Sequence, residues 1–136
     1  MVNENNIKSR LLKLEQYIND LMEFENIKLD EYRQKKLVRR FIERTLHLTI
    51  ESCLDIGNHI ISEERLGIAD SNTDIMKILA ENNIIKDNID TYIKMAKFRN
   101  IIVHDYAELD DEIIVNILNN ELSVFKQIFN WFQDYI

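Results

Sequence analysis

The sequence lacks the residues that most often interrupt helices. Its 136 residues contain no proline and only two glycines, Gly57 and Gly67. Proline and glycine are the strongest local breakers of regular structure, and the turns between β-strands commonly need them. Runs in which β-branched residues alternate with polar ones, as in strands, are also few. We therefore expect an all-α fold.

The sequence also has little cysteine and no long hydrophobic run. Its single cysteine, Cys53, cannot form an internal disulfide, and its apolar surroundings predict a buried structural thiol. This cysteine usage fits a reducing compartment. The initial segment MVNENNIKSR has no apolar core of signal-peptide length, and no run approaches the roughly 18 apolar residues of a membrane span. We expect a cytoplasmic protein that has no contact with membranes.

Positive charge is in deficit, with 17 basic residues against 24 acidic ones and a net charge of −7. Such a chain does not hold nucleic acid by bulk attraction, so an RNA or DNA contact requires a local basic patch. One basic stripe recurs every four positions, at Lys36, Arg40 and Arg44, with Arg33, Lys35 and Arg39 beside it. The stripe can contact RNA phosphates, dock an acidic partner, or form a solvated face paired with acidic residues such as Glu43.

Apolar residues at spacings of three and four predict five helices. We expect them at about residues 4–24, 30–65, 72–82, 87–103 and from 110 to near the end. The chain length and the apolar share of 46% favour a single domain over residues 1–136. Because the connections are short, neighbouring helices should be antiparallel, which predicts an up-and-down helical bundle.

Polar residues and the two glycines predict how these helices begin, end and pack. The expected capping residues are Asp30 for the second helix and Ser71 or Thr73 for the third. The fifth helix is expected to begin with Asp110, Asp111 and Glu112, whose negative charges suit the positive end of the helix dipole. Gly67 is expected to stop the second helix. Gly57 inside that helix costs about 1 kcal/mol relative to alanine, so it should mark a close contact with another helix.

Three polar side chains are concentrated at the end of the fourth predicted helix, in the stretch MAKFRNIIVHDYAELD. The pattern is Arg99-x4-His104-x-Tyr106, with Asn100 directly after the arginine. On an ideal helix, Arg99 and His104 lie about 140° apart around the axis and so face different directions. Either the helix ends here, or a second surface such as another copy of the chain completes the site.

Asp55, His59 and His47 are further candidates on the second predicted helix. Asp55 and His59 are four residues apart and therefore adjacent on one helical face. They can form a structural hydrogen bond, reach an RNA cleft, or contribute to a metal site, although two ligands alone do not make one. His47 has an apolar neighbourhood, so we expect an ordinary core or surface histidine.

Two separated stretches resemble the HEPN superfamily, specifically its HepT-like branch. The stretch RNIIVHDY resembles the Arg-x4-6-His motif in the HepT form, in which a tyrosine follows the histidine by two positions. The earlier stretch TIESCLDIGNHII resembles the second-helix signature of that branch, with Asp55 and His59 as its polar pair. The two matches occur in the family's order, and the resemblance covers most of the chain.

The resemblance implies a metal-independent endoribonuclease toxin that uses no cofactor and acts as a homodimer. Two copies of the motif would meet in one cleft, where a site need not lie on one face of one helix. His104 would be the acid or base when the RNA 2'-hydroxyl attacks its own phosphodiester. Arg99 would bind the negative charge of the transition state. Asn100 would orient the phosphate or stabilise the helix end, and these two roles stay open.

The resemblance also implies a switch at Tyr106. In HepT-like proteins the partner MntA, a nucleotidyltransferase antitoxin, adenylylates this tyrosine. A bulky negative group beside Arg99 would block the cleft and compete for the arginine's charge. The alternative function is a non-catalytic HEPN module that binds and regulates such a nucleotidyltransferase, which the net charge of −7 and the exposed stripes favour.

Overall fold

The all-α class is confirmed in a computed structural model of the chain. The structure describes residues 4–104 and 110–136, with side chains described for residues 6–102 and 110–136. Within these ranges the chain forms seven helices and no strand: α1 (Glu4–Met22), α2 (Leu29–Gln34), α3 (Lys36–Glu63), α4 (Asn72–Glu81), α5 (Ile89–His104), α6 (Asp111–Asn120) and α7 (Leu122–Tyr135).

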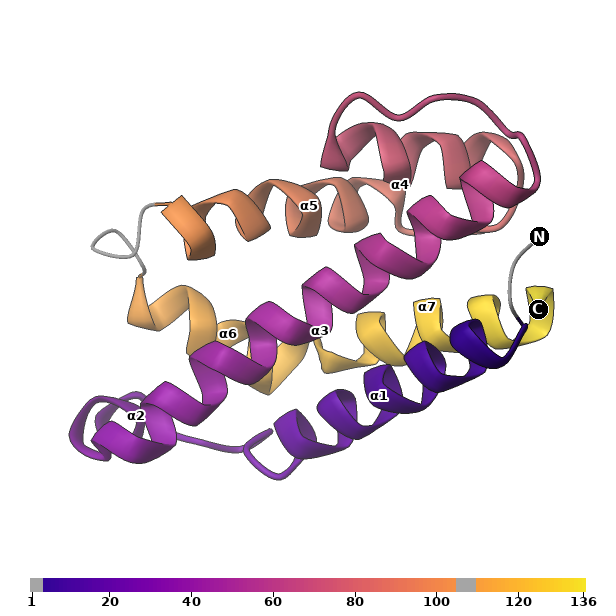
Figure 1. The fold of residues 1–136 in the computed structure, drawn as a ribbon. Coiled ribbons are helices and arrows are strands. Elements are labelled where there is room, and N and C mark those ends of the chain that lie inside the picture. The colour runs from indigo at the N-terminus through magenta and orange to yellow at the C-terminus, as the bar shows by residue number, and fades with distance from the viewer. Residues whose placement is uncertain (1–3, 105–109) are drawn as a thin grey trace.

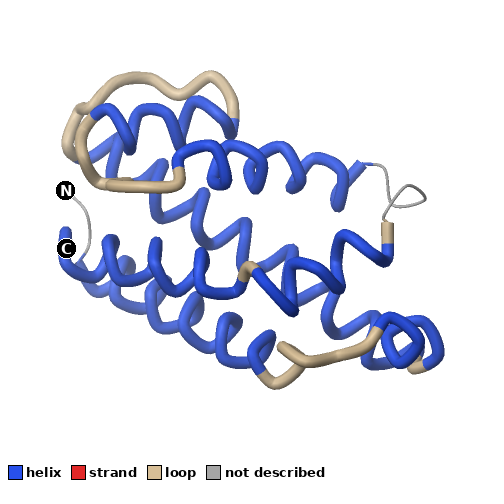
Figure 2. Tube along the Cα trace, turned by 180° about the vertical axis from the view of Figure 1, so that it is seen from behind, coloured by secondary structure: helices blue, strands red, loops and turns tan. Residues whose placement is uncertain are grey.

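The long helices form an up-and-down bundle around α3 (Figure 1). This central helix packs against α1, α4, α5 and α7. Along the chain, α1, α3, α5 and the α6–α7 pair alternate in direction, as the short connections predicted. The start of α1 and the end of α7 lie at one end of the molecule (Figures 1 and 2). At the other end lie α2, the end of α5 and the start of α6.

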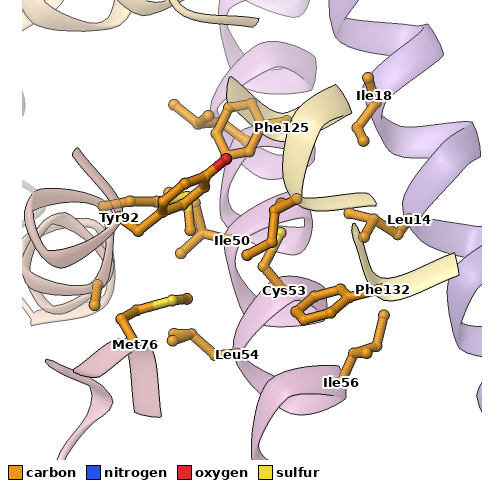
Figure 3. Close-up of a cluster of buried hydrophobic side chains, with 14 of the residues drawn as sticks. Leu14, Ile18, Ile50, Cys53, Leu54, Ile56, Met76, Tyr92, Phe125 and Phe132 are labelled. Carbon is orange, nitrogen blue, oxygen red and sulfur yellow. The ribbon is translucent and has the colours of Figure 1, made fainter. Parts of the chain in front are cut away.

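One apolar core joins the helices (Figure 3). Among its members are Leu14 and Ile18 from α1, Ile50 and Cys53 from α3, Met76 from α4, Tyr92 from α5, and Phe125 and Phe132 from α7. Full burial of such a side chain contributes about 1.5–3 kcal/mol relative to exposure. The predicted burial of Cys53 is confirmed, since none of its surface is exposed, and this burial raises the pKa of its thiol.

Two of the five predicted helices are each divided in two. The second predicted helix is interrupted at Lys35, whose backbone leaves the helical region (φ −94°, ψ 86°). The turn places α2 against α6, and the buried Tyr32 of α2 donates a hydrogen bond from its hydroxyl to Glu43 at 3.0 Å. The fifth predicted helix is interrupted at Glu121 (φ −123°, ψ 4°).

The predicted helix ends are partly right. Ser71 caps α4, since its side chain accepts a hydrogen bond from the Asp74 backbone N–H, and Asp110 caps α6 through the N–H of Glu112. The two predictions for the second helix were wrong. Asp30 lies inside α2, and α3 ends at Glu63, followed by Arg65 in the left-handed conformation at φ 53°.

Gly57 does mark a close helix contact, as predicted. A Cβ atom added at this position in α3 would lie 2.8 Å from Leu79 Cδ1 and 3.1 Å from Ile75 Cγ2, both on α4. Real Cβ atoms essentially never come within 3.0 Å of another atom, so the Leu79 side chain or α4 would have to move. The absence of a side chain at Gly57 therefore sets how near α4 packs to α3.

No described helix is both long and apolar enough to cross a bilayer.

Candidate active site at the end of α5

The predicted motif lies at the end of α5, which residues Ile89–His104 form. Arg99 sits a little more than one turn before the helix ends, and Asn100 beside it is exposed. His104 is the last residue of α5, and its side chain lies outside the described residues. Tyr106 lies outside them altogether. Structural evidence on the site therefore comes from Arg99, Asn100 and the residues that α3 places against them.

Arg99 is held by a carboxylate that the sequence reasoning did not single out. Its Nε donates a hydrogen bond to Oε1 of Glu51, which lies on α3, 48 positions away in sequence. Both side chains are partly accessible, at 27% for Arg99 and 28% for Glu51. Nη1 of Arg99 also lies 3.4 Å from Oδ1 of the neighbouring Asn100. The guanidinium is thus fixed at the surface between α3 and α5.

His47 lies beside this ion pair and is more than the isolated histidine that its neighbourhood suggested. Its Nε2 is 3.4 Å from the same Glu51 Oε1 that accepts the hydrogen bond from Arg99. This Nε2 atom is buried and has no hydrogen-bond partner among the described residues. The signal was present in the sequence, because His47, Glu51, Asp55 and His59 follow one another at intervals of four.

Asp55 and His59 continue this row one and two turns further along α3. The pKa of Asp55 is raised, mainly by partial burial and to a smaller extent by repulsion from Glu51. The positive charges of Arg10 and Arg99 lower this pKa but do not cancel the increase. Within the described part of the chain, Asp55 forms no hydrogen bond with His59, and the buried Nε2 of His59 has no partner. Asp55 therefore lies close enough to Arg99 for the two charges to interact. The hydrogen bond between Asp55 and His59 considered above is not formed.

The basic stripe separates into two groups. Arg33 and Arg39 form ion pairs with Asp111 at 3.3 and 2.9 Å, and Lys35 pairs with Glu31 at 3.3 Å. Lys36, Arg40 and Arg44 are exposed on α3 and form no ion pair with any described residue. At 100° per residue, Arg40 and Arg44 lie within about 20° of Glu51 around the helix axis, so they share its solvent-facing side. The second group continues the site along α3.

Asp111, the first residue of α6, binds two arginines of the basic stripe. Its carboxylate bridges Arg33 of α2 and Arg39 of α3, and Arg39 Nε also donates to the buried Glu43 at 3.1 Å. The start of α6 is therefore tied to the first half of the α2–α3 segment, and Arg99 of α5 is tied to its second half through Glu51. A phosphate near Arg99 would contact a guanidinium that is already held in place, and further cations lie along α3. This arrangement of positive charge is suited to binding a phosphodiester.

Comparison with known proteins agrees with this geometry. Residues 14–130 match the family described as ribonuclease HepT-like. The chain belongs to the HepT-like family. A HepT-like relative from Shewanella oneidensis, described as an mRNA nuclease HepT, is 36% identical over 101 residues, covering 74% of this chain and 76% of that protein. Another from Aphanizomenon flos-aquae, described as a tRNA nuclease HepT, is 26% identical over 131 residues, covering 96% of this chain and 89% of that protein.

A solved HepT-like structure is similar over nearly the whole fold. It is a tri-AMPylated Shewanella oneidensis HEPN toxin in complex with MNT antitoxin, and it superposes on this chain with a TM-score of 0.83 at 29% identity. The similarity covers 94% of this chain and 96% of that one. The HEPN fold and the HepT-like membership, both expected from the two sequence stretches, are thereby confirmed.

Proposed function

We propose that this chain is an endoribonuclease toxin of a HepT/MntA-type toxin–antitoxin pair. The observation that carries the proposal is the Arg99 guanidinium, which Glu51 fixes at a partly accessible position within the Arg-x4-His motif. The nuclease descriptions of the two relatives support it, as does the structural neighbour solved in complex with its antitoxin. We also propose that the chain acts in the cytoplasm, where an RNA substrate is available.

In the proposed reaction the RNA supplies its own nucleophile. His104 takes the proton of a ribose 2'-hydroxyl as the 2'-oxygen forms a bond to phosphorus, or it gives a proton to the departing 5'-oxygen as the phosphorus–oxygen bond breaks. The products are a 2',3'-cyclic phosphate and a free 5'-hydroxyl, so no water or cofactor is consumed. Arg99 binds the non-bridging oxygens, on which negative charge accumulates in the transition state.

The proposal includes a homodimer. One imidazole cannot serve both proton transfers at once, and a second copy of the chain supplies a second His104 to a shared cleft. Asn100, Asp55 and His59 are the proposed accessory residues at this cleft. Lys36, Arg40 and Arg44 are the proposed contacts for RNA phosphates, and their lack of ion pairs with described residues supports this role over a purely solvated face.

Regulation in this proposal acts through Tyr106. A nucleotidyltransferase antitoxin of the MntA kind transfers AMP to the phenol oxygen, and the added phosphate places negative charge near Arg99. The AMP-carrying state of the Shewanella oneidensis neighbour, together with its antitoxin, supports this part of the proposal. Intact mass after co-expression with such a partner would measure the modification directly.

The test is cleavage of RNA by the purified chain in the presence of EDTA, with detection of the cyclic phosphate. Arg99→Ala is expected to lower the rate by about 100-fold or more, since one transition-state donor is typically worth that much. Lys97→Ala removes an exposed cation on the far side of the same helix and should leave the rate unchanged.

Equal cleavage by Arg99→Ala and the native chain would contradict the catalytic role of the motif. A native chain that cuts no RNA yet forms a stable complex with a nucleotidyltransferase would instead support the non-catalytic module.

A further inference from the structure

Among the described residues, the way Glu51 binds Arg99 leaves the outer edge of the guanidinium without a bound carboxylate. A guanidinium is planar and carries five N–H donors, with Nε at one end and the two Nη atoms at the other. Glu51 accepts at Nε, and only Nη1 has another neighbour among the described residues, Asn100 Oδ1 at 3.4 Å. The outer edge between Nη1 and Nη2 keeps the paired donors that match two oxygens of a phosphate.

We propose that Glu51 is a positioning residue for Arg99, holding the guanidinium by its Nε–H so that the outer Nη edge is presented to an RNA phosphate. The proposal rests on the ribonuclease function proposed above and deepens it by assigning a role to a residue outside the Arg-x4-His motif. Glu51 does not touch the substrate in this arrangement and acts only through Arg99.

The physical need for such a residue follows from the arginine side chain. Arginine has several rotatable bonds, and an unrestrained guanidinium loses that freedom whenever it binds a phosphate. A carboxylate that already fixes the side chain in the free protein removes this cost at the moment of reaction. It also compensates the partial burial of Arg99, whose side chain is 27% exposed.

Neighbours on α3 restrict Glu51 in turn. His47 lies one turn before it, with Nε2 3.4 Å from the Oε1 atom that Arg99 uses. Asp55 lies one turn after it, and the repulsion between the two carboxylates contributes to the raised pKa of Asp55. Repulsion from Asp55 favours the orientation of Glu51 away from Asp55, toward His47 and Arg99.

A first experiment observes the ion pair by NMR in the native chain and in two variants. In ¹⁵N NMR spectra, the Nε–H of Arg99 is expected to exchange slowly with solvent, because it is engaged by Glu51. Glu51→Gln should shift this resonance and speed its exchange. Glu64→Gln removes the same charge about 20 Å further along the helix direction and should do neither. A rapidly exchanging Arg99 Nε–H in the native chain would overturn the proposal.

A second experiment separates positioning from simple structural support. Glu51→Gln is expected to lower kcat for RNA cleavage by about 10- to 100-fold while KM changes by less than about threefold, because a misplaced donor affects the transition state more than binding. In an Arg99→Lys background, which lacks the planar fork, Glu51→Gln should cost less than about threefold further. A native kcat in Glu51→Gln, or equal losses in both backgrounds, would overturn the proposal.

The two experiments also separate this proposal from the ribonuclease function. If the native chain cleaves no RNA, the proposed function fails, and a titration with an uncleavable 2'-O-methyl RNA decides the role of Glu51. Phosphate binding should then shift the Arg99 Nε–H of the native chain and of Glu64→Gln, and the RNA should bind at least about tenfold more weakly to Glu51→Gln. Equal binding by all three proteins would overturn the positioning role.

Discussion

At the scale of single residues, Asp55 carries a carboxyl group that the fold makes harder to ionise. Partial burial and the charge of Glu51 raise its pKa above the ordinary value of 3.8. The folded chain therefore binds this proton more tightly than the unfolded chain does. As a result, the ionised form of Asp55 lowers stability at neutral pH, and protonation removes that loss.

Asp55→Asn is accordingly expected to raise Tm at pH 7. The gain should shrink as pH falls through the raised pKa, and disappear well below 3.8, where Asp55 is protonated in both states. Calorimetry at pH 7, 5 and 3 would measure it. Glu15→Gln, at an exposed position on α1, controls for the loss of one negative charge from an acidic protein. A Tm at pH 7 no higher than that of the control would contradict the prediction.

The sequence located Arg99, Asn100 and Asp55 in the candidate site because each belongs to a local spacing pattern. It missed Glu51 because the partner of that carboxylate is 48 positions away, and one sequence carries no record of which helices become neighbours. The apolar residues around His47 predicted an ordinary core or surface histidine. Glu51 at its i+4 position was visible in the sequence, and the structure places the two side chains 3.4 Å apart.

At the scale of helices, Gly57 shows how one missing side chain sets a helix contact. A Cβ atom here would lie only 2.8 Å from Leu79, so any larger residue displaces α4 or the Leu79 side chain, which is fully buried. A glycine in a helix is otherwise unfavourable by about 1 kcal/mol relative to alanine. Adding a side chain at this position would therefore lower stability through packing and raise it through helix propensity.

Gly57→Ala is expected to lower the free energy of unfolding by about 1 kcal/mol, since overpacking of about 1–3 kcal/mol exceeds the gain in helix propensity. With Leu79→Ala already present, the same substitution should become stabilising, because the clashing methyl group is gone. Urea unfolding of the four proteins in this cycle would measure the coupling. The same effect of Gly57→Ala in both backgrounds would show that Leu79 does not limit the contact.

The helices themselves could be predicted because apolar spacing is a local property. The stripe of α1 is an example: Ile7, Leu11, Leu14, Ile18 and Leu21 are all buried as expected.

The breaks at Lys35 and Glu121 could not be predicted. Neither position has a proline or glycine, and the breaks depend on contacts with residues of other helices. Tyr32 bonds to Glu43 across the first break, and before the second the Asn119 side chain donates to the carbonyl of Ile27. In α6, Ile114 is buried with Leu118, and Ile113 is 48% exposed.

At the scale of the whole molecule, the net charge of −7 opposes the RNA binding that is proposed for this chain, whereas the exposed cations on one side of α3 would favour it. If the chain binds RNA as proposed, the local cations Lys36, Arg40 and Arg44 supply most of the electrostatic attraction. Each phosphate contact on a single strand contributes about 0.7 to the slope of log affinity against log salt concentration.

Replacing Lys36, Arg40 and Arg44 together by glutamine is expected to reduce that slope by about 2, and to weaken binding most at low salt. Fluorescence anisotropy with an uncleavable single-stranded RNA at several salt concentrations would measure it. A triple replacement of Lys13, Lys86 and Lys126, three exposed lysines on other parts of the chain, matches the change in charge. Equal slopes for the two triple variants would assign the effect to net charge rather than to the α3 stripe.

The complete enclosure of Cys53 has a practical consequence for studying assembly. Because the only sulfhydryl in the chain is inaccessible, a cysteine introduced at a surface position is the sole target for a spin label or fluorophore, and no background substitution is required. A single probe at the outer surface of α3 would report the separation between two copies of the protein. Electron paramagnetic resonance or energy transfer can thus measure how the proposed pair is arranged in solution.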